Sequence, residues 1–436
     1  MPNKFQRREI GKDIFFSSVT NPRFKFNIIT VNFVVPLSEE TASEYALVSR
    51  LLNEKSGKYP TLAELSSKLS SLYSAYYTNN VITLGDSQDM TAAIEYIDDR
   101  YALANEKVEE EAVEIFLDCL LDPPLENGVF PEKSFSLAKS VLIDDIEAEI
   151  NDREFYAGYR ADQIIFKDEP AAVRSLGSVE QAKRITPLTA YNAYKRLLKN
   201  AHIEIVCSGC SNFKYAERTI SKAFSKLERG EIFKCSTEKS PLKENPRRIF
   251  ETMPATQSKL VLGFKTDCEN YPALYVMSSI YGGTTTSKLF TNVRERLSLC
   301  YYCWSGVDRY KGALLVKSGV EKENTERVTE EIISQLEAIQ KGYFSDTEIE
   351  HAKMYRKNGL RTYNDDYRSI AAWYLMCIYN DDIKSPEDSI EESERVTREE
   401  IIEAARSVKL DTVYALTPPD DTDNNSDNKA KKEALS

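Results

Sequence analysis

The sequence predicts an α+β protein made of two copies of one unit of about 200 residues. The first observation is that one order of strands and helices occurs twice along the 436 residues. The second is a likeness between KLSSLYSAYYTNNV at 68–81 and RERLSLCYYCWSGV at 294–307. The third is the composition, 42% hydrophobic and 29% charged, which supplies apolar residues for sizeable cores and charge for a solvated surface.

The first copy opens with two strands, at 13–19 and 24–36, and the second of these is too apolar to lie on an exposed face. Pro60, Thr61 and Glu64 give a start signal for a helix at 61–73. Hydrophobic spacing predicts the remaining elements of this copy, which are helices at about 40–54, 109–121, 131–166 and 187–199 and strands at 75–86, 89–98 and 203–209.

The second copy repeats this order. Its expected strands are 259–266, 300–307, 312–320 and 412–418, and its expected helices are 269–281, 287–297, about 322–341, 345–379 and 398–408. The stretch between the copies is charged, contains proline and has no clear period. We therefore expect an N-terminal domain at 1–228, a linker at 229–247, a C-terminal domain at 248–418 and a disordered tail at 419–436, which is too polar to bury.

The overall charge and hydropathy limit the classes of binding partner that we expect. A net charge of −12 disfavours binding to nucleic acid and to anionic membranes. The first residues lack an apolar segment of signal-peptide length, and no run of 18 apolar residues occurs. We therefore expect a cytoplasmic protein that binds neither nucleic acid nor membrane.

Two cysteine pairs have C-x2-C spacing, Cys207 with Cys210 and Cys300 with Cys303. Together they could form a four-thiolate zinc site, but the interval between the pairs is far from that of a zinc ribbon. Both pairs lie in strand-like apolar or aromatic runs, where cysteine behaves as a small hydrophobic residue. A structural role is the favoured interpretation.

The chain has only two histidines, His202 and His351. Neither has a second histidine four residues away, so a helical two-histidine zinc site cannot form. No G-x-S-x-G elbow or Cys-His signature supports a serine or cysteine hydrolase. We expect both histidines to be structural or solvated.

The second copy contains G-G-x-x-x-S-K-L-F-x-x-x-R-E at 282–295, followed by Tyr301. This pattern and the duplicated unit resemble the pitrilysin/insulinase-type (M16) peptidase family over roughly residues 5–418. The resemblance implies two homologous domains, each an antiparallel sheet packed with helices, related by a pseudo-twofold axis. It also implies a clamshell that encloses unfolded peptides.

In that family the first copy carries an H-x-x-E-H zinc motif on its first helix, and a glutamate on a later long helix is the third ligand. In this sequence Arg50, Asn53 and Glu54 stand at the motif positions, and the distal acidic position falls at Asp144 and Asp145. Zinc catalysis needs about three protein ligands, an open position for water and a carboxylate base. The resemblance therefore implies a degenerate metal site, and we expect no zinc in this chain.

Arg294 and Tyr301 match the arginine and tyrosine with which the family holds the substrate backbone and stabilises the oxyanion. A guanidinium and a phenol are suitable donors to a peptide carbonyl. From the residues alone, a solvated helix charge and a packed strand tyrosine are the favoured interpretation, and the resemblance shifts the balance toward a substrate-binding role.

Some members of the family are heterodimers in which one subunit carries H-x-x-E-H and the other carries the arginine and tyrosine. The leading hypothesis is that this chain is the non-catalytic, peptide-binding subunit of such a pair, with zinc in the partner. The chain is also similar to degenerate bacterial M16-like proteins associated with elongation factor P modification. Two alternatives are a stand-alone or homodimeric peptide-binding scaffold and a peptidase with thiolate or carboxylate zinc ligands.

Overall fold

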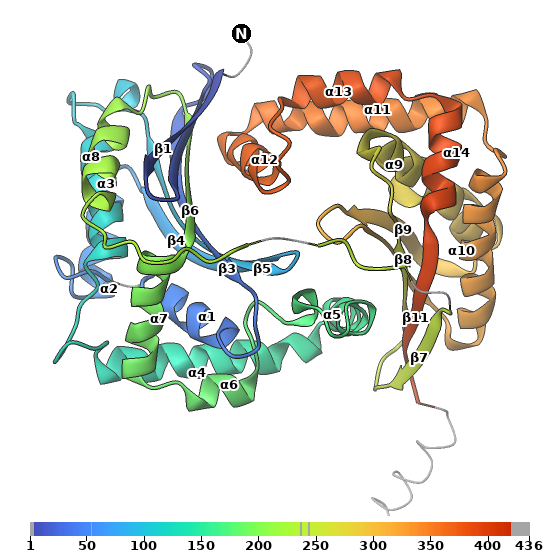
Figure 1. The fold of residues 1–436 in the computed structure, drawn as a ribbon, viewed down its shortest axis with the longest axis horizontal. Helices are drawn as coiled ribbons and strands as arrows, with labels where there is room; N and C mark the ends of the chain where they lie inside the picture. The colour runs from blue at the N-terminus through green and yellow to red at the C-terminus, as the bar shows by residue number, and fades with distance from the viewer. Residues whose placement is uncertain (1–3, 54, 236–237, 243–244, 420–436) are drawn as a thin grey trace, which may run out of the picture. The chain divides into compact units, whose positions relative to one another are not determined.

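The computed structural model describes residues 4–53, 55–235, 238–242 and 245–419 (Figure 1). The chain forms two compact units, here called the N-unit and the C-unit. The N-unit comprises Met1–Ala148, Asp168–Glu238 and Leu360–Asp388, and the C-unit comprises Glu149–Lys167, Lys239–Gly359 and Ser389–Ser436. Each unit therefore takes one segment from the other half of the chain. Residues 420–436, most of the expected tail, lie outside the described part.

The strands of the described residues form one sheet in each unit. The N-unit strands are β1 (Lys4–Gly11), β2 (Ile14–Thr20), β3 (Phe26–Pro36), β4 (Tyr76–Leu84), β5 (Ser87–Ile97) and β6 (His202–Gly209). The C-unit strands are β7 (Arg247–Thr252), β8 (Ser258–Lys265), β9 (Cys300–Asp308), β10 (Ala313–Val320) and β11 (Lys409–Thr417). Strands β1 and β7 were not expected from the sequence, because their charged residues interrupt the apolar pattern.

The two sheets have the same topology. The strand order is β1-β2-β6-β3-β5-β4 in the N-unit and β7-β11-β8-β10-β9 in the C-unit. Once β1 is set aside, the first, fifth, second, fourth and third strands of each unit follow one another in both sheets. The predicted α+β class and the internal duplication are confirmed. The sheets are mixed, however, because β2 and β6 are parallel, as are β7 and β11.

Helices occur in both halves of the chain. Those of the first half are α1 (Ala42–Leu51), α2 (Leu62–Ser71), α3 (Val108–Leu121), α4 (Glu132–Ala148), α5 (Arg153–Ile165), α6 (Val179–Arg184), α7 (Pro187–Asn200) and α8 (Lys214–Phe224). Those of the second half are α9 (Tyr271–Ser278), α10 (Thr325–Gln340), α11 (Asp346–Thr362), α12 (Tyr367–Tyr379), α13 (Pro386–Arg395) and α14 (Arg398–Ser407). Two π-helical segments, η4 (Ser279–Gly283) and η5 (Leu289–Arg296), follow α9. Short 3-10 turns are η1 (Asp99–Tyr101), η2 (Glu149–Asn151), η3 (Pro170–Ala172), η6 (Lys322–Asn324) and η7 (Tyr363–Asp365).

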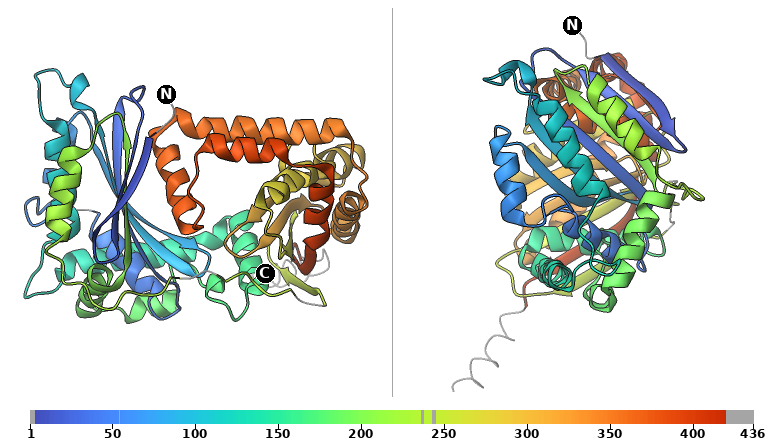
Figure 2. Two further views of the ribbon diagram at one scale, coloured as in Figure 1. Left: turned by 45° about the horizontal axis from the view of Figure 1, so that its top comes forward. Right: turned by 90° about the vertical axis from the view of Figure 1, so that its left-hand side faces the viewer.

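In the N-unit, helices cover both faces of the sheet (Figures 1 and 2). Helices α1, α3, α7 and α8 supply side chains to the main core on one face. Helix α12 packs on β3 and β6 on the other face, where Ala371 contacts a small cluster of Ile28, Ala93 and Val206. The segment that follows residue 360 is therefore part of the N-unit core.

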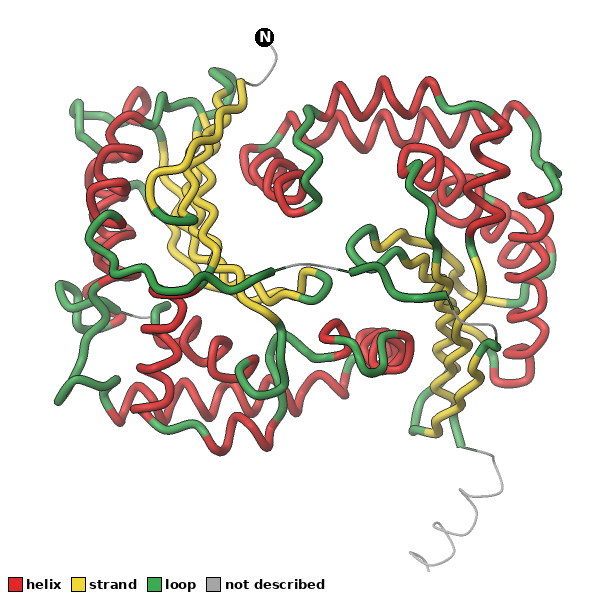
Figure 3. The backbone as a smooth tube through the Cα atoms, in the orientation of Figure 1, coloured by secondary structure: helices red, strands yellow, loops and turns green. Residues whose placement is uncertain are grey.

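In the C-unit, α9, α10 and α14 pack on one face of the sheet and α5 on the other (Figure 3). Helix α5 comes close to β8 because Gly263 has no side chain. A Cβ at Gly263 would lie 2.4 Å from Ile165 Cδ1. A larger residue at this position would push α5 away from the sheet.

The prediction of continuous helices at 131–166 and 345–379 is wrong in both cases. Each is broken near its middle, between α4 and α5 and between α11 and α12. The second helix of each pair begins after an N-cap aspartate: Asp152 accepts from the backbone N–H of Phe155, and Asp366 accepts from that of Ser369. Hydrophobic periodicity continues across both breaks, and the caps set the helix starts.

Among the residues that the structure describes, no helix is long and apolar enough to cross a membrane.

Candidate functional site

The positions that the resemblance assigns to a degenerate metal site lie in the N-unit, where the end of α1 meets α4. Arg50, in the last turn of α1, forms an ion pair with Asp145 of α4, with 2.6 Å between Nη2 and Oδ2. Its Nε atom is buried and has no hydrogen-bond partner among the described residues. The structure thus joins Arg50 and Asp145, and a fixed guanidinium charge faces the distal acidic residue.

Asn53 is held by the neighbouring strand. Its Oδ1 accepts a hydrogen bond of 3.1 Å from the backbone N–H of Asn79 in β4. Since β4 is an edge strand, this N–H points away from β5, and Asn53 occupies part of the open edge. Asp144 is exposed, and Glu54 lies outside the described residues.

These residues do not fit a zinc ion. The guanidinium of Arg50 offers hydrogen-bond donors but no acceptor and cannot coordinate a metal, and Asp145 is already paired with it. The amide of Asn53 cannot serve as a proton-accepting base. In the described part of the chain, no group of three or more His, Cys, Asp or Glu side chains is placed to hold a metal.

The Arg50–Asp145 pair is expected to contribute little to stability. The Asp145 side chain is 49% exposed, so solvent screens the attraction. Asp145→Asn should lower the free energy of unfolding by less than about 1 kcal/mol, measured by urea denaturation. Asp144→Asn, an exposed neighbour, is the matched control, and a loss several times larger for Asp145→Asn would mean that the pair is a structural anchor.

Arg294 lies in η5 of the C-unit and is held in place by two contacts. Its Nε donates a hydrogen bond of 2.9 Å to the backbone carbonyl of Tyr301, and its guanidinium lies 4.6 Å from the centre of the Phe290 ring. Within the described residues, Nη1 and Nη2 have no partner. The side chain is exposed, so these two groups can donate to a ligand.

Tyr301 is 58% exposed, and its hydroxyl donates to the carboxylate of Glu321. This hydrogen bond raises the pKa of Tyr301. Because the only proton of the hydroxyl is used, the phenol oxygen can accept from a further group but cannot donate to one. The structure thus brings Arg294 and Tyr301 together, because the Arg294 side chain is bonded to the Tyr301 carbonyl. The guanidinium and the phenol do not act as two donors to a common point.

The glycine pair of the motif brings η4 against β9. A Cβ at Gly282 would lie 2.8 Å from the backbone nitrogen of Ser305 and 2.7 Å from Leu289 Cδ1. Only glycine allows this approach, which sets η5 and therefore Arg294 beside the start of β9. π-helical turns are rare in proteins, and those that occur often lie at functional sites.

Sequence reasoning missed Phe290, Glu321 and Asn79. Phe290 lies four residues before Arg294, a spacing that predicts contact on a helix. Glu321 follows β10 and Asn79 lies in β4, and no local pattern connects either residue to the motif. Glu321 and Asn79 reach their partners because distant strands pair, and this pairing is not visible in the sequence alone.

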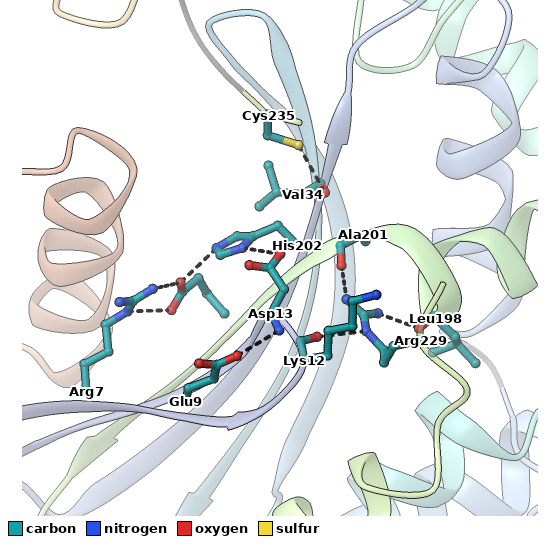
Figure 4. A network of polar contacts seen from close by, with 11 residues as sticks. Arg7, Glu9, Lys12, Asp13, Val34, Leu198, Ala201, His202, Arg229 and Cys235 are labelled. Atoms are coloured by element: carbon teal, nitrogen blue, oxygen red, sulfur yellow. Dashed lines mark hydrogen bonds and ion pairs between the residues drawn. The ribbon is translucent and has the colours of Figure 1, made fainter. Parts of the chain in front are cut away.

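His202 lies within a buried polar network of the N-unit (Figure 4). Its Nδ1 and Nε2 contact Asp13 and Glu204 at 2.9 Å each. Burial lowers the pKa of His202, but Glu204 and Asp13 outweigh it and raise the pKa above its usual value. Glu204 is fully buried and also pairs with Arg7, with 2.5 Å between Oε1 and Nη2. His351, on α11, is exposed.

Comparison with known proteins defines the class. Residues 184–355 match the family model described as peptidase M16 inactive domain. The fold resembles the crystal structure of a peptidase M16 inactive domain from Pseudomonas fluorescens, with a TM-score of 0.78 and 17% identity over 95% of this chain and 98% of that one. The fold is similar to that of an M16-like peptidase domain.

Two relatives match nearly the whole chain. A probable inactive metalloprotease, YmfF of Bacillus subtilis (strain 168), is 27% identical over 403 residues, which cover 91% of this chain and 94% of the relative. A conserved protein from Enterococcus faecalis V583 has a TM-score of 0.86 and 26% identity, covering 95% of this chain and 99% of that structure. Over most of its length this chain is therefore similar to M16-like peptidase homologues that are described as inactive.

Proposed function

We propose that this chain is the non-catalytic, peptide-binding subunit of a two-chain M16-type zinc peptidase. The partner would be an M16 paralogue that carries H-x-x-E-H and holds the zinc. The observation that carries this proposal is the contrast between two sites. Arg50 fills the metal position with a paired cation, whereas Arg294 is oriented by Tyr301 and Phe290 and keeps two donor groups available.

The ligand would be an extended peptide. The Nη groups of Arg294 can donate to a backbone carbonyl or to a carboxylate. In the N-unit, β4 is an edge strand with exposed Tyr76 and Ile82. Because Asn79 directs its N–H outward, Val81 and Thr83 direct theirs to the same side. This edge is a second place, separate from Arg294, where a peptide strand could pair with the chain.

A second candidate is a peptide-binding scaffold that acts without any peptidase, alone or as a homodimer, including a role near elongation factor P modification. The contact between Tyr301 and Glu321 favours it, because a phenol whose one hydrogen bond is donated to a carboxylate cannot donate to an oxyanion. Under this candidate Arg294 binds peptide and no partner supplies chemistry.

Affinity purification of the full chain from its native lysate, with mass spectrometry of the co-purifying proteins, separates the two candidates. A stoichiometric partner with an H-x-x-E-H sequence, in a complex that cleaves an unstructured peptide, supports the two-chain peptidase. Recovery of the chain alone or with a second copy of itself overturns it. Peptide binding by the isolated chain would then support the scaffold.

Glu321→Ala is expected to tighten peptide binding by about 2- to 10-fold, because it returns one neutral hydrogen-bond donor to Tyr301. Glu323→Ala removes the same charge from an exposed neighbour and is the control. Fluorescence anisotropy of a labelled unstructured peptide measures both. Equal affinities for the two variants, or a gain that persists in Glu321→Ala/Tyr301→Phe, would show that the phenol does not contact the peptide.

A further inference from the structure

A β-bulge places Cys300 and Cys303 on one face of β9. In the pairing with β10, Cys300 lies opposite Val320, Tyr302 opposite Gly319 and Cys303 opposite Ser318. Tyr301 is thus an extra residue in the ladder. In a regular strand, residues three apart point to opposite faces, and one inserted residue returns them to the same face.

The packing agrees with this register. Cys303 is buried within the main core of the C-unit, and Cys300 packs against the same core while keeping part of its surface exposed. Opposite Tyr302, Gly319 makes room for the ring, since a Cβ there would lie 2.5 Å from Tyr302 Cε1. The bulge is therefore built into the sequence of both strands.

The two thiols interact and are not equivalent. The hydrogen bond from Cys303 lowers the pKa of Cys300, and burial opposes this shift. A hydrogen bond from Ser318 and the charge of Arg294 lower the pKa further, to about 7. The same thiol contact, together with burial, raises the pKa of Cys303. Cys300 is thus the accessible nucleophile, and Cys303 is the buried thiol beside it.

We propose that Cys300 and Cys303 are a reversible thiol–disulfide pair, a redox modification site at the start of β9. This site is independent of the peptide-binding role proposed above. Its substrate is a small disulfide of the glutathione class. The pair also explains why two cysteines lie on either side of the bulge next to the arginine motif.

The exchange proceeds in two displacements. The Cys300 thiolate attacks one sulfur of the small disulfide, forms a mixed disulfide and releases one thiolate. The Cys303 thiol then loses its proton and attacks Cys300 Sγ, forming the intramolecular S–S bond and releasing the second thiolate. Two protein thiols and one disulfide give one protein disulfide and two small thiols, so the oxidant takes up both electrons.

The other C-x2-C pair is a matched internal control. Cys207 is buried in the N-unit core, and Cys210, just after β6, is half-buried beside Arg100 and Asp98. Burial raises the pKa of Cys207, and burial also raises the pKa of Cys210 to about 11. The spacing is identical, but no low-pKa thiol starts the exchange.

The test uses the full chain, reduced, freed of reductant and exposed to oxidised glutathione at pH 7. Acid quenching, alkylation and peptide mass spectrometry then locate the remaining free thiols. We expect Cys300 and Cys303 to be lost together and Cys207 and Cys210 to stay free. Cys303→Ser should accumulate a glutathione adduct on Cys300, and Cys300→Ser should slow the reaction of Cys303 at least tenfold.

A second measurement needs no substitution and therefore does not depend on folding of the variants. In the reduced protein at pH 7, iodoacetamide should alkylate Cys300 at least tenfold faster than Cys268, a partly exposed thiol whose pKa is raised by burial. Equal rates would overturn the proposal. So would a lasting glutathione adduct on Cys300 in the unsubstituted chain, because Cys303 would then fail to resolve it.

Discussion

Arg294→Ala is expected to weaken peptide binding by about 10- to 100-fold. The substitution removes the one guanidinium whose Nη1 and Nη2 are available while Nε is held by the Tyr301 carbonyl. A hydrogen bond from a charged donor contributes about 1.5–3 kcal/mol, and each 1.4 kcal/mol is tenfold in affinity. Anisotropy titration of a labelled unstructured peptide, with the purified chain and with any partner complex, measures the change.

Arg296→Ala is the matched control for this prediction. Arg296 is also exposed in η5, so its removal changes the net charge by the same amount. We expect a change of less than about threefold, since exposed charges act weakly through salt-screened attraction. Arg294→Lys should recover only part of the affinity, because an ammonium lacks the fork of donors. Equal losses for Arg294→Ala and Arg296→Ala would reduce the effect to general electrostatics.

Glu204→Ala is expected to cause the largest loss of stability, about 3–5 kcal/mol. The Glu204 carboxylate is fully buried and pairs with Arg7 of β1 and with His202 of its own strand (Figure 4). Removing one partner of a buried charge network leaves the other charges unpaired, and this cost is typically about 3–5 kcal/mol. Urea denaturation followed by circular dichroism measures it.

The pH dependence of stability tests the same network. Because the pKa of His202 is raised in the folded state, its contribution is fully present below the ordinary value of about 6.5 and is lost as pH rises through the folded pKa. Burial raises the pKa of nearby Asp89 to about 7, against the hydrogen bonds of Tyr379 and Thr91, so its effect has the same sign. His202→Gln keeps the Asp89 carboxyl but removes the His202 charge that lowers its pKa, so the difference between the two pH profiles reports the histidine together with its coupling to Asp89.

Between about pH 6 and 8, the unsubstituted chain should therefore lose more unfolding free energy than His202→Gln does. Glu204→Gln separates charge from shape, since the amide fills the same space without the carboxylate charge. If Glu204→Ala costs less than about 1 kcal/mol, or if the two pH profiles are parallel, the network does not stabilise the N-unit.

Local signals in the sequence predicted local structure well. Thr61 and Glu64 form the expected capping box, with each side chain bonded to the backbone of the other residue. The strands β3 and β8 were evident because their apolar runs are buried on both faces. These features depend on neighbours within a few residues, and such neighbours are visible in the sequence.

Features that a continuing apolar period masks, or that distant pairing sets, were not predicted. The breaks before α5 and α12 depend on aspartates that look like ordinary helix-surface residues. That Cys300 and Cys303 share a face of β9 was not visible in the sequence, because it depends on the bulge at Tyr301 in the pairing with β10. At the candidate site, the residue types at Arg50 and Asp145 were visible, but their contact depends on how α1 packs on α4.

The exchange of α5 and α12 between the units affects how the chain is made. A ribosome that has released only residues 1–238 has produced every strand of the N-unit sheet but not the helix that covers its second face. The patch around Ile28, Ala93 and Val206 then remains exposed to solvent until Ala371 and Leu375 have been synthesised, well over a hundred residues later. Nascent chains stalled in this interval expose this apolar patch, a kind of surface that favours aggregation, and the N-unit core is completed only when the segment at 360–388 has been made.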